Sequence, residues 1–236
     1  MHPAAALLYR SHSNDRVGIY VAIFVVFIII AIVAWYFSKA NRLKRALRDA
    51  KAMPIGQFPE NTPGKVVGQA HPVGQTLVGP LTGRPCLYYI AIVEQHVSTG
   101  RSSYWKQIIK EEMGVMFQVV DASGRAIVDP RGADVVLTFD GTSKSGTFND
   151  ADPVQEAFLQ RHGQSSKGWV FNKGLRFKEA MIEINETVAI LGSGIREPDP
   201  MMAPAQDYRS GPPTLLRLTS SPKFPLVISD DHTTTQ

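Results

Sequence analysis

The stretch that decides the fold covers residues 84–97 and reads RPCLYYIAIVEQHV. Cys86, the only cysteine of the chain, is followed by seven apolar residues, Leu87 to Val93. A short, continuous apolar run of this kind is typical of a strand that is buried on both faces. We therefore expect a long, doubly covered strand over residues 86–97.

Short β segments punctuated by turn residues lie on both sides of this strand. Residues 121–124, Asp-Ala-Ser-Gly, carry the preferred first and fourth residues of a type I turn. One short helix is expected from an N-cap at Asp152 and Pro153 to a C-cap at Gly163. The sequence predicts a mainly β (α+β) domain, an antiparallel β-sheet or a barrel-like fold with one short helix. The remaining expected strands are residues 65–70, 75–78, 104–112, 115–120, 126–129, 134–139, 175–184, 187–191, 215–218 and 224–229.

An uncharged apolar segment precedes this domain. Residues 17–37, VGIYVAIFVVFIIIAIVAWYF, would span roughly 31 Å as a helix, which matches the hydrocarbon core of a bilayer. The segment is longer than the apolar part of a signal peptide and does not end in small residues, so we expect an uncleaved transmembrane helix. Its predicted anchor residues, mostly aromatic and near the two interfaces, are Val17, Tyr20, Trp35, Tyr36 and Phe37.

Basic residues cluster directly after the apolar segment. They lie in a predicted juxtamembrane helix, residues 38–53, and are Lys39, Arg42, Lys44, Arg45, Arg48 and Lys51. Only Arg10 and Arg16 precede the segment, so the charge asymmetry predicts residues 1–16 outside and the C-terminal domain in the cytoplasm. The six cations are also expected to face anionic lipid.

The remainder of the chain is nearly neutral. The chain has 25 basic and 21 acidic residues, but residues 53–236 hold only 17 and 19 of them. This balance argues against a nucleic-acid partner. A single cysteine excludes an internal disulfide and Cys-rich zinc sites, and the six histidines lack ligand-like spacing, so neither a metal nor another cofactor is expected.

Candidates for catalysis are weak. Cys86 has Arg84 nearby, which would favour a thiolate, but no histidine is close in sequence, and a small buried hydrophobe is the favoured interpretation. The central aspartates lie beside turn residues, where they commonly bond to backbone. Residues 141–147 have Thr147, and not lysine, directly after the second glycine, where a phosphate loop needs its lysine, so we expect a flexible loop. We expect residues 192–194 to form a turn. A Cys- or Asp-dependent membrane-anchored hydrolase stays open as an alternative.

Several short motifs follow one another between roughly residues 63 and 229. They are Lys65-Val-Val-Gly68, Pro85-Cys-Leu-Tyr-Tyr89, Tyr104-Trp105, Phe117-Gln-Val-Val-Asp121 with Gly124, Val128-Asp129-Pro130 with Ala133, Glu179, Val188-Ala-Ile-Leu-Gly192 and Leu226-Val-Ile-Ser229. In this order they resemble the GIDE, or "beside a membrane", domain of MULAN-type membrane-anchored ubiquitin ligases and of many prokaryotic membrane proteins. The signature positions expected to serve packing and turns are Cys86, Tyr88, Tyr89, Trp105, Phe117, Asp121, Gly124, Asp129 and Gly192.

The resemblance implies a β-rich domain held close to a bilayer and supplies no catalytic residues. The ligases of the family act through a separate RING domain with bound zinc, which a chain with one cysteine cannot build. We therefore expect a non-catalytic binding or scaffolding module whose partners are the bilayer and an unidentified protein at or near the membrane. Ligase-type function with a RING supplied by another chain stays open. The expected layout is an anchor, a linker over residues 54–63, a domain over residues 64–230 and a disordered tail over residues 231–236.

Overall fold

The computed structural model describes residues 19–21, 23–30, 34, 38–139, 141–145, 152–166, 174–199, 213–221 and 224–236. The chain forms two compact units, Met1–Arg45 and Ala46–Gln236. Residues 19–21, 23–30 and 34 are helical, and a second helix, α2, covers Lys39–Asp49. Among the residues described, none of the helices has both the length and the apolar character needed to cross a bilayer. Val17, Trp35, Tyr36 and Phe37 of the predicted anchor lie outside the described residues.

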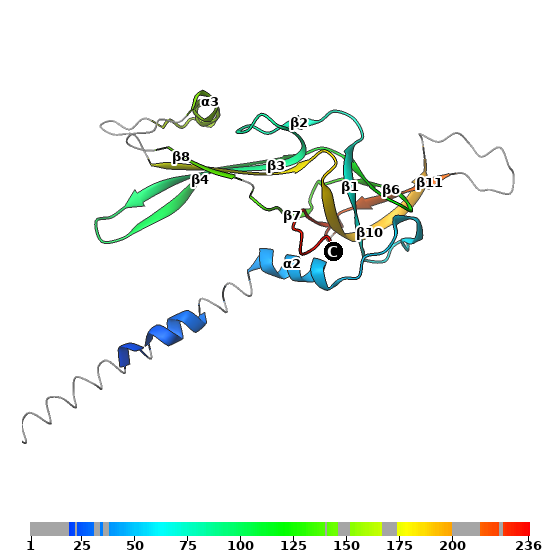
Figure 1. Ribbon diagram of the computed structural model, residues 1–236, viewed down its shortest axis with the longest axis horizontal. Coiled ribbons are helices and arrows are strands. Elements are labelled where there is room, and N and C mark those ends of the chain that lie inside the picture. The colour runs from blue at the N-terminus through cyan, green and yellow to red at the C-terminus, as the bar shows by residue number, and fades with distance from the viewer. Residues whose placement is uncertain are drawn as a thin grey trace, which may run out of the picture. The chain divides into compact units, whose positions relative to one another are not determined.

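Five strands of the second unit close into a barrel (Figure 1). They are β1 (Gly64–Pro72), β5 (Phe117–Asp121), β6 (Gly124–Val128), β11 (Thr214–Thr219) and β10 (Thr187–Pro198), in that spatial order. Antiparallel pairing of β1 with β10, from Gly64 opposite Gly192 to Gln69 opposite Thr187, closes the ring. The pairing of β6 with β11 is parallel. A five-stranded barrel with this connectivity has the topology of an OB-fold.

Two insertions into the barrel together build a second sheet. The first insertion, between β1 and β5, contains β2 (Leu77–Val78), β3 (Pro85–Ser98) and β4 (Ser103–Gly114). The second, between β6 and β10, contains β7 (Asp134–Val136), β8 (Gly141–Ser145), helix α3 (Pro153–Arg161) and β9 (Leu175–Glu183). Both insertions leave the barrel at the same end, since β1 and β6 finish where β5 and β10 begin. Strand β3 can therefore pair with β2 and β4 on one side and with β9 on the other, while β8 pairs with β9.

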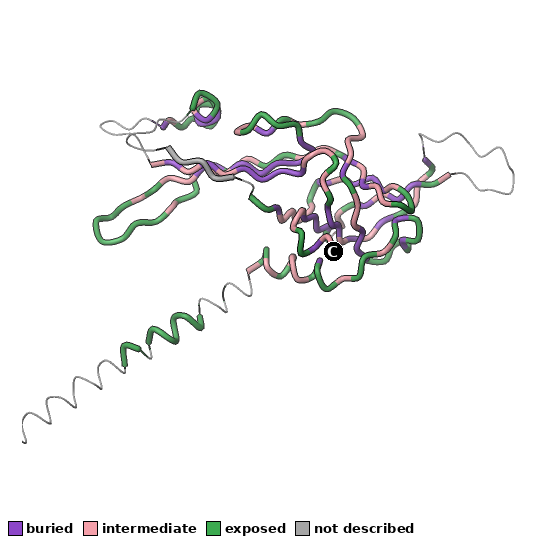
Figure 2. Tube along the Cα trace, viewed as in Figure 1, coloured by how far each residue is buried: buried purple, intermediate pink, exposed green. Residues whose placement is uncertain are grey.

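Strand β3 is buried over much of its length (Figure 2). It lies between two separate cores, which confirms the expectation from its apolar run. Tyr88 and Ile90 belong to the core that the sheet shares with the barrel. Tyr89, Ala91 and Val93 point to the other face and pack with Phe158 and Leu159 of α3. Because both faces are covered, the strand needs no polar alternation between residues 86 and 93.

Two local predictions are confirmed in detail. Asp121 Oδ1 accepts hydrogen bonds from the amides of Ser123 (2.7 Å) and Gly124 (2.9 Å), which fixes the β5–β6 turn. Asp152 caps α3 by accepting from the amide of Gln155 (2.8 Å), and Pro153 is the first helical residue. Gln155 completes a capping box, a feature beyond the expected N-cap. Gly163, with φ of +66°, follows the helix as expected.

The expected mainly β fold with a barrel-like architecture is confirmed, but three finer expectations about the β structure are wrong. The sheet is not purely antiparallel, because β6–β11 and β7–β12 are parallel pairs, where β12 is Val227–Ser229. The expected loop at residues 141–147 contains β8, whose backbone pairs with β9. The expected turn at residues 192–194 is strand, because β10 continues to Pro198 along β11. In both cases pairing with a long neighbouring strand decides the conformation against weak local propensity.

Two segments expected to lack structure are packed. Within the expected linker, residues 55–57 form a short 3₁₀ helix, η1, and the side chains of Ile55 and Phe58 enter the main core. The amide of Ile55 donates to Asp121 Oδ2 (2.9 Å). At the C-terminal end, the amide of Thr234 donates to the carbonyl of Asp231 (2.8 Å), and the Thr234 side chain is buried. Both segments thus contribute to the barrel's covering.

Candidate functional site

Cys86 is a buried thiol at the start of β3. It is fully inaccessible and packs among Tyr89, Met181 and other apolar side chains beneath α3. Burial raises the pKa of this thiol to about 11, and the carboxylates of Glu179 and Glu183 act in the same direction. Arg84 opposes the shift but forms an ion pair with Glu183. The environment therefore keeps Cys86 protonated and shielded, which is the opposite of what a nucleophile needs.

Glu179 of β9 is a buried carboxylate with a structural task. It is 5% exposed. Its oxygens accept from the amide of Leu81 (2.9 Å), the amide of Thr82 (3.1 Å) and the hydroxyl of Thr82 (2.5 Å). The carboxylate thereby fixes the loop between β2 and β3, which includes Gly83 at φ of +71°. Glu179 lies among the motifs of the resemblance, but its place in the sequence does not indicate this role.

A polar cluster around Glu111 joins β4, β3 and α3. Glu111 accepts from the hydroxyl of Tyr89 (2.6 Å) and from Arg161 Nη2 (2.9 Å), and its Oε2 lies 2.7 Å from His162 Nε2. Burial of Glu111 acts to raise its pKa, but the bonds from Tyr89 and His162 and the charge of Arg161 outweigh it and lower the pKa. Burial and the bond to Glu111 raise the pKa of Tyr89. The cluster ties the end of α3 to the sheet, and the spacing of these residues in sequence gave no signal for it.

A second tyrosine–glutamate pair occupies the opposite face of the same strands. The hydroxyl of Tyr88 donates to Glu112, which also pairs with Lys110 Nζ (2.6 Å). Burial, followed by the bond to Glu112, raises the pKa of Tyr88 well above its usual range. Tyr88 and Tyr89 thus act as polar-tipped core residues, one on each face of β3.

Most other signature positions lie in the core or in turns. Phe117 is fully buried in the main core, and Asp121 and Gly124 form the β5–β6 turn. A Cβ added to Gly192 would lie 2.6 Å from Leu226 Cδ1, so a larger residue here would have to displace the buried Leu226 side chain. Asp129 Oδ1 accepts from the amide (3.1 Å) and Nε (2.9 Å) of Arg131 within the loop after β6.

Trp105 differs from the other signature residues, because it is partly exposed and carries a cation on its ring. The guanidinium carbon of Arg176 lies 4.4 Å from the centre of the indole, and the His96 ring lies 5.1 Å away. Arg176 also binds Glu94 through Nε (2.6 Å), and Lys178 binds Glu94 (3.0 Å). Trp105 is therefore part of a polar surface, a role that its place in a motif did not indicate.

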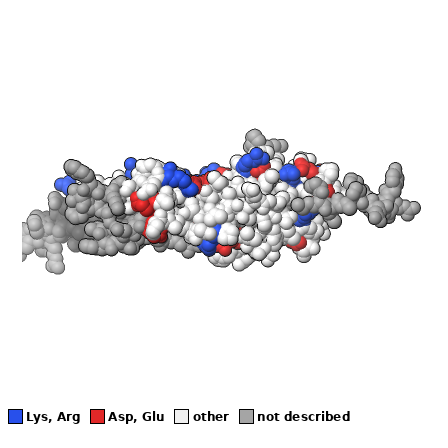
Figure 3. Space-filling model, turned by 90° about the horizontal axis from the view of Figure 1, so that it is seen from above, with Lys and Arg blue, Asp and Glu red and all other residues white. Residues whose placement is uncertain are grey.

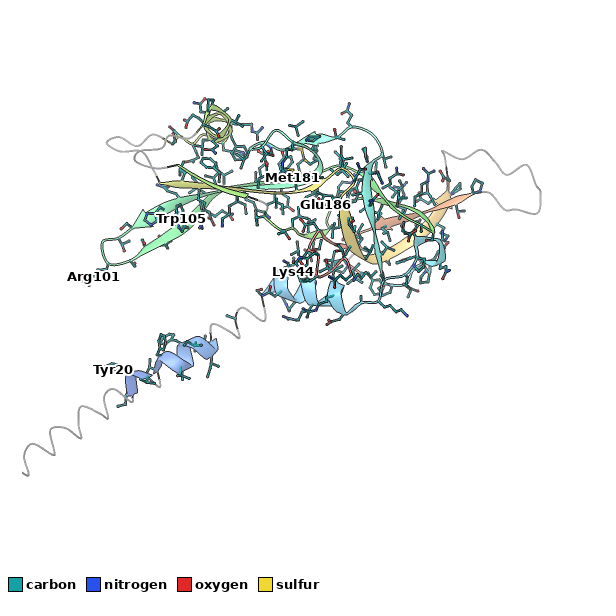
Figure 4. All side chains as sticks on the ribbon, viewed as in Figure 1. Tyr20, Lys44, Arg101, Trp105, Met181 and Glu186 are labelled. Atoms are coloured by element: carbon teal, nitrogen blue, oxygen red, sulfur yellow. The ribbon has the colours of Figure 1, made fainter. Side chains whose placement is uncertain are left out.

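The basic residues expected to face lipid lie on α2 and just after it. Lys39, Arg42 and Arg48 are exposed, Lys44 and Arg45 are partly exposed, and Lys51 is exposed beyond the helix end. Leu47 is fully buried. The helix is thus amphipathic, with cations over much of its surface (Figure 4, where Lys44 is labelled).

A shallow groove of about 430 Å³ lies where both insertions join the barrel. Its lining is mainly apolar, and Met116 is largely exposed. The lining residues are Val73, Gly74, Gln75, Gly114, Val115, Met116, Asp129, Pro130 and Arg131. The two charged side chains of the lining, Asp129 and Arg131, are paired with each other, which leaves Gln75 as its other polar side chain. The groove therefore lacks the convergent polar groups of a catalytic pocket.

No set of three His, Cys, Asp or Glu side chains within the described residues is arranged to hold a metal ion. On the face seen in Figure 3, basic and acidic side chains lie next to one another. Comparison of the chain with family models, with curated proteins and with solved structures gives no match in any of the three. By its fold, the protein is therefore a five-stranded β-barrel that carries a second, inserted β-sheet.

Proposed function

We propose that this chain is a single-pass membrane protein whose β-rich domain is a non-catalytic, membrane-proximal binding or scaffolding module. The anchor would be the apolar segment over residues 17–37, with the domain on the cytoplasmic side. A tether of this kind raises the effective concentration of the domain toward partners in the same membrane. Membership in the GIDE family is part of the proposal and rests on the quoted motifs.

One observation carries the proposal. Every large apolar side chain described between residues 19 and 30 is exposed, from 43% for Ile28 to 70% for Tyr20. These residues are helical, and they present apolar surface on all sides of the helix. A helix that is apolar all round requires a protein core or a bilayer to cover it. An uncharged run of 21 residues has the length for the bilayer.

The basic helix α2 supports the same placement. Its cations follow the apolar segment directly, where they would lie in the headgroup region of an inserted chain. Each cation near an anionic leaflet contributes about 1 kcal/mol. The same asymmetry of charge supports the cytoplasmic orientation.

The structural contacts of the candidate reactive groups support a binding role over hydrolysis. Cys86 is buried and protonated, and Glu179 accepts three hydrogen bonds from a loop. Asp121 and Asp129 are engaged by the backbone of their own turns. Groups that are fully occupied in holding loops are poor general acids or bases, because catalysis needs them free to exchange a proton. Within the part of the chain that the structure describes, no contact favours the ligase-type alternative.

The proposal is tested on membranes from cells that express the full chain. Alkaline carbonate should leave the protein in the pellet, whereas a variant with Phe24, Phe27 and Ile30 changed to Asp should be released. Protease added to sealed inside-out vesicles should degrade residues 46–236, and protease added to intact cells should not. Release of the unmodified chain by carbonate would refute the anchor, and degradation in intact cells would refute only the orientation.

A further inference from the structure

The hairpin of β3 and β4 extends past the rest of the second sheet (Figure 1). The last bonds from the neighbouring strand reach Gln95 and His96, through Leu175 and the carbonyl of Gly174. Among the described residues, only β3 and β4 form the hairpin from Val97 to Tyr104, and a bond from the Thr99 amide to the Ser102 carbonyl (2.9 Å) closes it. A two-stranded ribbon with no packing partner is marginally stable in water, so a surface that receives it would stabilise it.

This projecting tip carries aromatic and cationic side chains together. Tyr104, paired with Val97, is 52% exposed. Trp105, paired with His96, points to the opposite face and is stacked by Arg176. Arg101 lies at the end of the hairpin and Trp105 closer to the sheet (Figure 4). Tyrosine and tryptophan with neighbouring cations are typical of protein surfaces that sit in the headgroup region of a bilayer.

Charge is distributed unevenly between this end of the domain and the rest. Residues 94–107 and 174–178 hold four basic side chains, Arg101, Lys106, Arg176 and Lys178, and one acid, Glu94. The other residues between 53 and 236 hold 13 basic and 18 acidic side chains. The hairpin end is therefore net positive although the domain as a whole is net negative, and it is complementary to an anionic surface.

We propose that the tip of the β3–β4 hairpin, residues 97–106, docks on the anionic lipid surface of the membrane that holds the tether. The inference rests on the proposed anchor, because the tether brings the domain within reach of that surface. Tyr104 and Trp105 would lie at the headgroup level, and Arg101 and Lys106 would contact lipid phosphates. The hairpin then fixes the domain's orientation above the bilayer and leaves the barrel end free for other partners.

The test uses the full chain in nanodiscs with a nitroxide label on a single introduced cysteine. Ser103→Cys places the label at the tip, and Thr219→Cys, on an exposed barrel position, is the matched control. Cys86 is buried, so the unmodified chain reports the background labelling. Nanodiscs of phosphatidylcholine alone are compared with nanodiscs of phosphatidylcholine and phosphatidylglycerol in equal parts.

In anionic nanodiscs the tip label should lose access to a water-soluble nickel complex and gain access to oxygen, while the control label stays unchanged. Raised salt, or Arg101→Glu with Lys106→Glu, should return the tip label to the control value. If the tip label and the control label have the same accessibility in both lipids, the hairpin does not dock on the membrane. If the tip label becomes immobilised in lipid-free micelles as the protein concentration rises, the hairpin binds a second copy of the chain and not the lipid surface. Carbonate extraction of the same samples reports on the anchor separately, so a retained chain with a water-exposed tip refutes only the docking.

Discussion

The ring of Tyr88 lies directly against Gly114, its paired residue across the β3–β4 ladder. A Cβ built on Gly114 would lie 2.2 Å from Tyr88 Cδ2 and 3.0 Å from Pro130 Cγ. An aromatic side chain that covers a glycine on the neighbouring strand compensates for the missing side chain there. This contact also directs the Tyr88 hydroxyl toward Glu112.

Gly114→Ala should therefore destabilise the domain by about 1–3 kcal/mol, because the new methyl group must displace a buried ring. The free energy of unfolding from urea titration is the measurement. Gly74→Ala is the matched control, since a Cβ at Gly74 meets no atom within 4 Å. A Gly114→Ala variant as stable as Gly74→Ala would mean that Tyr88 can move without cost.

The strand pattern was predictable wherever side-chain burial alone sets it. Strand β3 was predictable from its apolar run, because residues 86–93 are covered on both faces and need no polar alternation. The turn at Asp121 and the cap at Asp152 were predictable too, because each depends on residues within three positions in sequence. Local chemistry of this kind is visible in a single sequence.

The parallel pairs and strand β8 were not predictable, because they depend on partners distant in sequence. Leu216 pairs with Ala126, and Lys144 pairs with Arg176. The cluster around Glu111 has the same origin: Tyr89, Glu111 and His162 converge only because α3 crosses the sheet. The spacing of these residues in the sequence does not indicate that they contact one another, so the role of Glu111 could not be predicted from the sequence.

Glu179 provides a second prediction. Glu179→Gln should lower the free energy of unfolding by about 1–3 kcal/mol, because an amide group cannot accept from all three donors and buries a donor of its own. Amide exchange at Leu81 and Thr82 should speed up first, since these amides lose their acceptor. Glu183→Gln, which alters an exposed pair with Arg84, should change stability by less than about 0.5 kcal/mol. Unchanged exchange at Leu81 and Thr82 would contradict the role assigned to Glu179.

Cys86 should make the domain sensitive to alkali. The folded-state pKa of about 11 exceeds the ordinary value of 9.0. The unfolded chain therefore loses its thiol proton first, so stability is intact below pH 9 and is lost as the pH rises toward 11. The shift corresponds to roughly 2–3 kcal/mol at most.

The measurement is the unfolding free energy of the unmodified chain minus that of Cys86→Ala as a function of pH. Tyrosine ionisation acts on both proteins and cancels in the difference. The difference should be constant below pH 9 and fall above it. Maleimide should label Cys86 in urea and leave the native protein unlabelled, and rapid labelling of the native protein would refute a buried, protonated thiol.

Glu111 should control how firmly α3 is attached to the sheet. Its pKa is lowered in the folded protein, so its contribution is present above pH 4.5 and is lost as acid protonates it. Glu111→Gln should reproduce the effect of acid at neutral pH, because it removes the charge that Arg161 and His162 contact. Faster amide exchange across Pro153–Arg161, with the barrel strands unchanged, is the expected result.

Glu112→Gln is the matched control for this helix, since Glu112 is the next residue on β4 but bonds to Tyr88 on the opposite face. It should weaken the main core and leave the local exchange of α3 as it is. If both variants loosen α3 equally, the helix follows the stability of the whole sheet and Glu111 is not its attachment. If neither does, the apolar contacts of Phe158 and Leu159 hold the helix without help from the polar cluster.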